Sequence, residues 1–283
     1  MINTIINPNF TIVMPGGCNA KCDFCFWKQE KTCDNYLEKL QDTMDGLPSQ
    51  FYQLSISGGE PTLSTYFKDV LELIDIEQFT HRILTTNGIA LLNHIDIIKE
   101  KIQHINISRH HFDDEINAKI FDTNNIPNTE YIIKCVEELN MAGIDVTFSA
   151  VLTDEYIKTK DDILNYVDYA KRCGASHIYF RKKHENLEPH YLEKEFGLSK
   201  IIDSHDCPAC RTRIQLIKGI DVHWKTSVLE PTDVIDEIFE TIFNANGIMT
   251  RDWMSKYPID PLDIFDNYYD NIEYDPQTGE KII

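Results

Sequence analysis

Short runs rich in β-branched and apolar residues alternate with longer amphipathic segments along most of the chain. This alternation is typical of repeated βα units, in which helices cover a sheet of parallel strands. We expect strands at residues 10–14, 53–57, 82–86, 104–108, 146–151 and 178–181. The sequence therefore predicts an α/β fold: a partial (βα)6 barrel of the TIM type with a small α+β extension at its C-terminus.

The segments between the expected strands have helical periodicity. In one of them Phe67, Val70, Leu71 and Ile74 fall at the spacing that places residues on a single face of a helix. Gly143 ends a later helix, because glycine readily adopts the left-handed conformation found at helix ends. Folds of this class carry their chemistry at the carboxyl ends of the strands, so residues directly after the strands are the candidates for a site.

We divide the chain into a core over residues 1–185 and an extension over residues 186–283. Within the extension we expect a hairpin around Lys218 and Gly219, a helix from Thr232 to Phe243, and an acidic tail.

The net charge of the chain indicates which kinds of binding partner can be expected. The chain of 283 residues carries 46 Asp and Glu against 27 Lys and Arg, a net charge of -19. A surface this negative repels phosphate backbones and anionic lipids, so we expect neither nucleic acid nor a membrane as partner. No apolar stretch has the length of a membrane span, and the N-terminus lacks the basic segment of a secretory signal. We therefore expect a cytoplasmic protein.

Three of the eight cysteines, Cys18, Cys22 and Cys25, lie on one short segment after the first expected strand. A structural zinc site needs four closed ligands, whereas a [4Fe–4S] cluster held by three thiolates leaves one iron open for an exogenous ligand. The spacing alone is also compatible with a zinc site whose fourth ligand lies elsewhere in the chain, or with three cysteines that bind no metal.

Three motifs together resemble the radical S-adenosylmethionine (radical SAM) superfamily. The Cys-x3-Cys-x2-Cys loop at residues 18–25, with the aromatic Phe24 before its last cysteine, is similar to the cluster loop of that family. A Gly-Gly-Glu element within residues 57–62 follows the second strand, and Thr-Asn-Gly at residues 86–88 follows the third. The resemblance covers about residues 9–185. It implies a [4Fe–4S] cluster on the three cysteines and S-adenosylmethionine as cofactor.

The resemblance also implies which residues contact S-adenosylmethionine: Phe24, Gly58, Gly59, Glu60, Asn87, Ser108 and Arg109. Phe24 is expected near the adenine, and Asn87, Ser108 and Arg109 near the ribose or the methionine carboxylate. The two glycines would expose backbone groups without side-chain obstruction. Glu60 has two open roles, since it could accept from the methionine ammonium or fix its own loop.

The resemblance implies reductive cleavage of S-adenosylmethionine to a 5′-deoxyadenosyl radical, which takes a hydrogen atom from the substrate. The cofactor supplies most of this chemistry, and a low-potential electron donor such as flavodoxin or ferredoxin is implied as a partner. Lys21, Lys28 and Lys31 around the cysteine loop could receive an acidic donor. Alternatively they are solvated loop lysines.

Cys207 and Cys210 resemble the start of the auxiliary-cluster module of a twitch or SPASM-like extension. The module is degenerate, because Trp224 occupies the position at which related proteins carry a third cysteine. Four interpretations of the pair stay open: a remnant that packs the hairpin, an auxiliary cluster, a zinc site, or a redox-active dithiol. An auxiliary cluster would be completed by His205, His223 or Cys33, and a zinc site by the two histidines. Cys135 and Cys173 fall on helical segments and are expected to be packing residues.

Basic residues gather after the sixth strand and at the start of the extension: Arg181, Lys182, Lys183, Arg211 and Arg213. Such groups at the barrel mouth of an acidic protein indicate an anionic small substrate, since arginine binds phosphate or carboxylate in bidentate fashion. The alternative is that they neutralise neighbouring acidic side chains. His110 and His111 follow the fourth strand and could donate or accept a proton near the substrate, or belong to a structural network.

The leading hypothesis is therefore a radical SAM enzyme acting on a small anionic substrate, a nucleotide or a natural-product intermediate. The second is a radical SAM peptide or protein maturase, although the first strand begins close to Met1 and we expect no leader-peptide domain before it. The third is a non-catalytic iron–sulfur or zinc-binding protein, against which the Gly-Gly-Glu element weighs.

Overall fold

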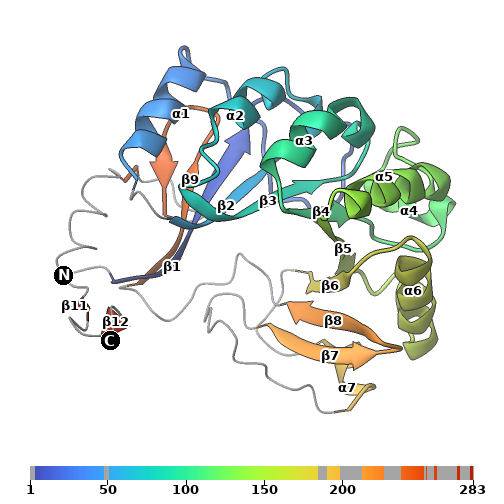
Figure 1. Cartoon of the computed structure of the whole chain (residues 1–283). Helices are drawn as coiled ribbons and strands as arrows, with labels where there is room; N and C mark the ends of the chain where they lie inside the picture. Colours follow the sequence, from blue (N-terminus) through green and yellow to red (C-terminus); the bar gives the residue numbers. More distant parts are fainter. Residues whose placement is uncertain are drawn as a thin grey trace.

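The computed structural model describes residues 4–47, 51–183, 190–197, 212–225, 237–251, 253, 258–259, 273–274 and 281–282. Its centre is one ten-stranded sheet with the strand order β10-β9-β1-β2-β3-β4-β5-β6-β8-β7. The sheet curves into an arc whose outer side is covered by helices (Figure 1). This arrangement is the α/β partial barrel that the sequence predicts.

The first six strands follow the chain and pair in parallel. They are β1 (Thr4–Met14), β2 (Phe51–Gly58), β3 (Phe79–Thr86), β4 (His104–Ser108), β5 (Asp145–Leu152) and β6 (His177–Lys182). Each contains one of the six expected strands, so all six predictions are confirmed. The local pattern sufficed here because each strand is a short, mostly apolar run that is followed by a helix.

The α-helices of the described residues are α1 (Tyr36–Asp45), α2 (Phe67–Leu73), α3 (Ile95–Lys101), α4 (Asp114–Phe121), α5 (Thr129–Met141), α6 (Lys160–Arg172) and α7 (Tyr191–Lys194). Two short 3-10 helices, η1 (Pro61–Leu63) and η2 (Leu91–His94), follow β2 and β3. Phe67, Val70 and Leu71 of α2 are buried as expected. Gly143 adopts a φ of 76° just beyond α5, which confirms it as the residue that ends this helix.

The two faces of the sheet differ in polarity. On the outer face, under the helices, residues such as Ile105 and Ile107 of β4 and Phe148 of β5 are fully buried. The alternate residues, such as Asn106 of β4 and Thr147 of β5, lie on the concave face. A strand directs successive side chains to opposite faces, so the helices bury the apolar set and leave a polar set on the concave side.

Two strands of the extension join one edge of the sheet. β7 (Arg213–Ile217) and β8 (Ile220–Lys225) form an antiparallel hairpin, and β8 pairs in parallel with β6. Lys218 and Gly219 form its turn with φ values of 50° and 79°, so the predicted hairpin is confirmed.

The expected helix from Thr232 to Phe243 is wrong for its described part. Residues Glu237–Phe243 form strand β9, which pairs in parallel with β1 and antiparallel with β10 (Met249–Thr250). Apolar spacing in this segment suits a helix as well, but the free edge of β1 offers hydrogen-bond partners that no local pattern reveals. A separate small sheet joins β11 (Glu273–Tyr274) to β12 (Lys281–Ile282).

The extension thus adds strands to both edges of the core sheet. The boundary between residues 185 and 186 stays a prediction. Within the described residues, no helix has the length and apolar character needed to cross a membrane.

Candidate active site

The three cysteines of the expected cluster loop lie directly after β1 on a segment without helix or strand. Cys18 and Cys25 are exposed and Cys22 is half-buried, and all three are free thiols. Burial is the main cause that raises the pKa of Cys22 to about 12, and the neighbouring thiols of Cys25 and Cys18 contribute to the same rise. A cationic metal centre would favour the thiolate form and lower this pKa.

The donor set fits an iron–sulfur cluster with an open iron, because it consists of three soft thiolates on one short loop. In the described part of the chain, no three His, Cys, Asp or Glu side chains are arranged to hold one metal ion.

Asn19 ties the cluster loop to its surroundings. Its Oδ1 accepts from Asn87 Nδ2 at 2.8 Å, and its Nδ2 donates to the Asn125 carbonyl at 2.5 Å. Two residues later the Lys21 amide donates to the carbonyl of Phe121, the last residue of α4, at 2.8 Å. Asn19 is a site residue that was not predicted, although its place between the first two cysteines is a signal that could have identified it.

Glu60 is buried and takes the second of its two expected roles. Its Oε1 accepts from the amide and hydroxyl of Thr62, at 3.1 and 2.7 Å, and from the Thr86 hydroxyl at 2.5 Å. Its Oε2 accepts from the Asn87 amide at 2.7 Å. Burial raises the pKa of Glu60, while these hydrogen bonds oppose the rise. The carboxylate therefore joins the loop after β2 to the end of β3.

The two glycines before Glu60 allow the loop after β2 to approach the cluster loop. A Cβ on Gly59 would lie 2.6 Å from the Gly17 carbonyl oxygen, and Gly58 has a φ of 135°. The Glu60 amide donates to the same Gly17 oxygen at 3.1 Å. The Trp27 side chain also lies 2.8 Å from the position of such a Cβ, so the close approach of the Gly17 backbone and the Trp27 ring requires glycine at position 59.

Phe24 of the cluster loop lies in contact with His110, which follows β4. Their rings meet edge to face with centroids 4.9 Å apart, and Phe121 packs on the same imidazole at 4.7 Å. Burial lowers the pKa of His110 to about 3, with the charge of Arg109 adding to the effect. The Nδ1 of His110 accepts from the Val151 amide at 3.1 Å, so the ring is neutral and fixed.

His111 has structural contacts of the same kind. Its Nδ1 accepts from the Asp113 amide at 3.0 Å, and its ring stacks on Phe112. The amides of both histidines donate to the Asn117 side chain. These contacts favour the structural network for His110 and His111 over the proton donor or acceptor, which stays a prediction.

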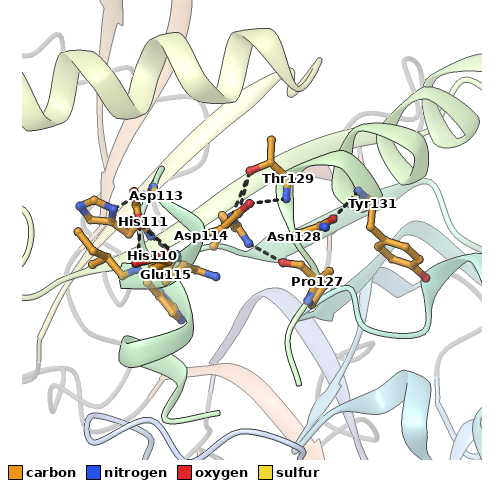
Figure 2. Close-up of polar contacts among 12 residues, drawn as sticks. His110, His111, Asp113, Asp114, Glu115, Pro127, Asn128, Thr129 and Tyr131 are labelled. Carbon is orange, nitrogen blue, oxygen red and sulfur yellow. Dashed lines mark hydrogen bonds and ion pairs between the residues drawn. The ribbon is translucent and has the colours of Figure 1, made fainter. Parts of the chain in front are cut away.

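Arg109 points into the helical layer. Its guanidinium pairs with Asp114, at the start of α4, and donates to the Pro127 carbonyl at 2.8 Å. The Asp114 carboxylate also accepts from the amide and hydroxyl of Thr129, the first residue of α5. Figure 2 shows these contacts around Asp114 and Thr129. The expected contact of Arg109 with S-adenosylmethionine stays a prediction, while Ser108 lies half-buried on the concave face with Asn106.

The residues expected to bind an anion have three different environments. Lys183 pairs with Asp23 of the cluster loop at 2.9 Å. Arg213 forms a two-pronged contact with buried Glu193 of α7, at 2.5 and 2.7 Å, which supports the alternative that it neutralises an acidic neighbour. Arg181 lies half-buried on the concave face of β6.

Beside the cluster loop, at the carboxyl ends of β5 and β6, lies a cavity of about 670 Å³. Its lining includes Lys21, Asp23, Glu155, Lys182, Lys183 and Tyr191. Basic and acidic side chains alternate around it, and it lies where a partial barrel is expected to admit its substrate.

The proposed second site is not described as a whole. Cys207, Cys210, Arg211 and His205 lie outside the described residues. His223 lies in β8 at one end of the strand order, whereas the Cys33 amide donates to Ala245 at the other end, beyond β9. Cys135 and Cys173 are 0% and 2% exposed, which confirms that they are packing residues.

Comparison with known protein families and sequences gives consistent matches. The profile of the radical SAM superfamily matches residues 12–156. A probable GTP 3′,8-cyclase of Methanococcus maripaludis strain C7 is 26% identical over 192 residues, covering 65% of this chain and 63% of that protein. The GTP 3′,8-cyclase of a Synechocystis species is 29% identical over 168 residues, covering 55% and 48%.

Among solved structures, Streptococcus suis SuiB bound to the precursor peptide SuiA superposes with a TM-score of 0.66 at 15% identity. The match covers 95% of this chain and 66% of SuiB. The chain thus spans less than two thirds of SuiB and of the first Methanococcus relative. At this identity the structural likeness shows a shared fold.

Proposed function

This chain belongs to the radical SAM superfamily, and we propose that it abstracts a hydrogen atom from a small anionic substrate, a nucleotide or a natural-product intermediate. A [4Fe–4S] cluster and S-adenosylmethionine are the cofactors of the family. When bound, they supply the electron and the radical-forming nucleoside. The chain's own residues bind and orient these groups and exclude water.

The observation that carries this proposal is the connection between the thiol loop and the ends of β2 and β3. Glu60 joins Thr62, Thr86 and Asn87, and Asn87 in turn reaches Asn19 between the first two cysteines. A simple electron carrier has no need of such a scaffold. A site that must hold a second cofactor against the open iron does need it, since small displacements of reacting groups are costly.

The proposed roles follow the positions of the residues. Cys18, Cys22 and Cys25 would hold the cluster, while the half-buried backbone of Gly58 and Gly59 would receive the methionine headgroup. For the substrate, Lys21, Lys182 and Lys183 line the cavity beside the cluster loop. The lining holds four lysines and four carboxylates, of which Asp23 pairs with Lys183, whereas the whole chain carries a net charge of -19. A cavity that is less negative than the rest of the protein favours an anionic ligand over a cationic one.

An acidic low-potential electron donor, flavodoxin or ferredoxin, is the proposed protein partner. Lys21, Lys28 and Lys31 are exposed on or beside the cluster loop, where an acidic donor could dock close to the thiols.

The test is anaerobic reconstitution with iron and sulfide, followed by iron counting and assay of 5′-deoxyadenosine under strong reduction. We expect about four iron atoms per chain and release of 5′-deoxyadenosine. Replacing Cys18, Cys22 and Cys25 by serine should abolish both, whereas Cys33→Ser is the matched control and should keep both. A reconstituted chain with full iron that releases no 5′-deoxyadenosine contradicts the proposal.

A further inference from the structure

We propose that the β9–β10 hairpin of the extension positions the cluster loop, by holding the chain where it leaves that loop toward α1. The hairpin consists of β9, a turn at residues 244–248, and β10, and Trp253 lies just beyond it. This inference rests on the proposed function, because the hairpin would fix the segment that carries the cluster thiols. The positioning residues of the extension would be Gly247 and Trp253.

Residues 15–35 connect β1 to α1 without a helix or strand of their own. Such a long connection must be fixed by other parts of the fold, because ordering each backbone residue costs about 1–2 kcal/mol. Its first half is held from the core. The Gly17 carbonyl accepts from the Glu60 amide, and the Lys21 amide donates to the carbonyl at the end of α4. Neither of these hydrogen bonds involves residues 26–35, which contact the hairpin.

The turn of the hairpin lies against Cys33. The Cys33 amide donates to the Ala245 carbonyl at 3.1 Å. Gly247 has a φ of 78°, and a Cβ at this position would lie 2.7 Å from Cys33 Sγ and 3.0 Å from Lys39 Cδ. Because the turn approaches Cys33 this closely and its backbone is left-handed here, position 247 requires glycine.

The turn is itself fixed by hydrogen bonds. The Asn244 amide donates to the Ile248 carbonyl and the Gly247 amide to the Asn244 carbonyl, both at 2.9 Å. The Asn244 side chain also donates to the Thr250 hydroxyl at 3.0 Å. β9 pairs in parallel with residues 9–12 of β1, the strand that leads into the cluster loop (Figure 1). The hairpin is therefore anchored in the sheet at the place where the chain enters the loop.

Two aromatic contacts join the hairpin to the same part of the chain. The rings of Trp253 and Phe26 meet edge to face with centroids 5.4 Å apart, and Phe26 directly follows Cys25, the last of the three cysteines. Tyr36, the first residue of α1, packs on Phe243 of β9 with ring centroids 5.5 Å apart. The hairpin thus contacts the chain directly after the cluster loop as well as at the start of α1.

The hairpin holds both β1, which enters the cluster loop, and the segment that leaves it. Three thiolates on one loop can hold a cluster in a fixed place only if the ends of that loop are fixed, and small displacements of reacting groups are costly. Contacts around metal ligands orient those ligands in the same way. Loss of the hairpin contacts should therefore loosen the cluster loop while the barrel stays folded.

The test compares amide hydrogen exchange of the full chain, without cluster, in two variants with the same backbone strain. Gly247→Ala places a Cβ against Cys33. Gly219→Ala is the matched control, since Gly219 has a φ of 79° in the turn between β7 and β8, and a Cβ there would meet no atom of the described residues within 4 Å. We expect exchange of residues 15–35 to be about tenfold faster in Gly247→Ala and unchanged in Gly219→Ala.

Further variants keep the test decisive if Gly247→Ala unfolds the hairpin. Adding Cys33→Ala removes the sulfur atom that the new Cβ would strike, so the double variant should exchange at nearly the wild-type rate. Trp253→Ala removes the ring contact with Phe26 and should speed exchange of residues 15–35, whereas Trp253→Phe keeps an aromatic ring and should exchange slowly. The inference is overturned if Gly247→Ala and Trp253→Ala exchange like their controls, or if Gly219→Ala is as fast as Gly247→Ala.

Reconstituted samples give a readout that a general loss of stability would not change. In electron paramagnetic resonance of the reduced cluster with S-adenosylmethionine, we expect a broader signal in Gly247→Ala and the wild-type signal in the double variant. Release of 5′-deoxyadenosine by the wild-type chain tests the proposed function separately. If it is released but all variants exchange alike, this inference fails and the proposed function stands. If the variants loosen residues 15–35 but no 5′-deoxyadenosine is released by wild type, the proposed function fails and the role of the hairpin stands.

Discussion

Asn87, at the end of β3, donates a hydrogen bond of 2.8 Å to Asn19, which lies between the first two cysteines of the cluster loop. This contact connects the conformation of the thiol loop with the carboxylate of Glu60, because Glu60 accepts from the Asn87 amide. The loop that would hold the cluster and the loop that would receive S-adenosylmethionine are therefore parts of one hydrogen-bonded unit.

Removing the Asn19 side chain should loosen the cluster loop without unfolding the barrel. Asn19→Ala loses the hydrogen bonds to Asn87 and Asn125, each worth about 1 kcal/mol. We expect the reconstituted variant to release iron to a chelator several times faster than wild type, with a similar melting temperature. Asn124→Ala, an exposed neighbour of the second partner, is the control. Equal rates of iron release in wild type and Asn19→Ala would contradict a role for this contact.

Glu60→Gln should damage both stability and cofactor binding. The amides of Thr62 and Asn87 and the hydroxyls of Thr62 and Thr86 all donate to the carboxylate, so the amide NH2 of glutamine would face a donor at a buried position. The cost is about 1–3 kcal/mol for the unsatisfied group. Urea unfolding measures the loss of stability, and equilibrium dialysis measures weaker S-adenosylmethionine binding. Unchanged affinity for S-adenosylmethionine would show that the hydrogen bonds of Glu60 between the ends of β2 and β3 do not contribute to cofactor binding.

Gly59→Ala tests the close approach of the two loops. The new Cβ would lie 2.6 Å from the backbone oxygen of Gly17, and backbone cannot move aside as a flexible side chain can. We expect loss of S-adenosylmethionine binding and reduced iron content. Gly46→Ala is the matched control, since Gly46 has a φ of -81° and its nearest atoms would be 3.5 Å from the Cβ. If both variants behave like wild type, the loops are not held in contact.

The features that depend on local sequence pattern could be predicted from the sequence. The six core strands, the turn at Lys218 and Gly219, and the order of the motifs after the strands follow from apolar periodicity and glycine placement. Strand β9 could not be predicted in this way, because its partner β1 is more than two hundred positions away. The partner of Arg213 is also fixed by tertiary structure, since Glu193 belongs to α7 and is buried there.

Arg109 illustrates the same limit within the site. Its position after β4 indicates a rim residue, but the turn that follows directs its guanidinium to Asp114 and Pro127. Asp114→Ala should therefore destabilise the fold by about 2–3 kcal/mol, because it leaves a buried guanidinium without its charged partner. A double-mutant cycle of Asp114→Ala and Thr129→Val compares the free energies of unfolding in urea of the two single variants and the double variant. It separates the contribution of the ion pair from that of the hydrogen bonds between Asp114 and Thr129. Strict additivity of the two changes would contradict a shared network.

His104, on the concave face of β4, should make the stability of the fold depend on pH. Its Nε2 lies 3.1 Å from Asn106 Oδ1 and 3.0 Å from the Thr147 hydroxyl, and burial lowers its pKa to about 4. In the unfolded chain the imidazole has its ordinary pKa of about 6.5, so the unfolded state binds more protons between these values. Stability is therefore complete above about pH 6.5 and falls as the pH drops toward 4.

At pH 5 the loss attributable to His104 is about 2 kcal/mol relative to neutral pH. His104→Gln keeps a side chain that can bond to Asn106 or Thr147 but cannot bind this proton. We expect urea unfolding of the variant to show a pH dependence between 7 and 5 that is smaller than wild type by about that amount. Measurement at pH 8, where the imidazole is neutral in both states, gives the cost of the substitution itself. An equal loss between pH 7 and 5 in both chains would show that His104 ionises as readily in the fold as in water.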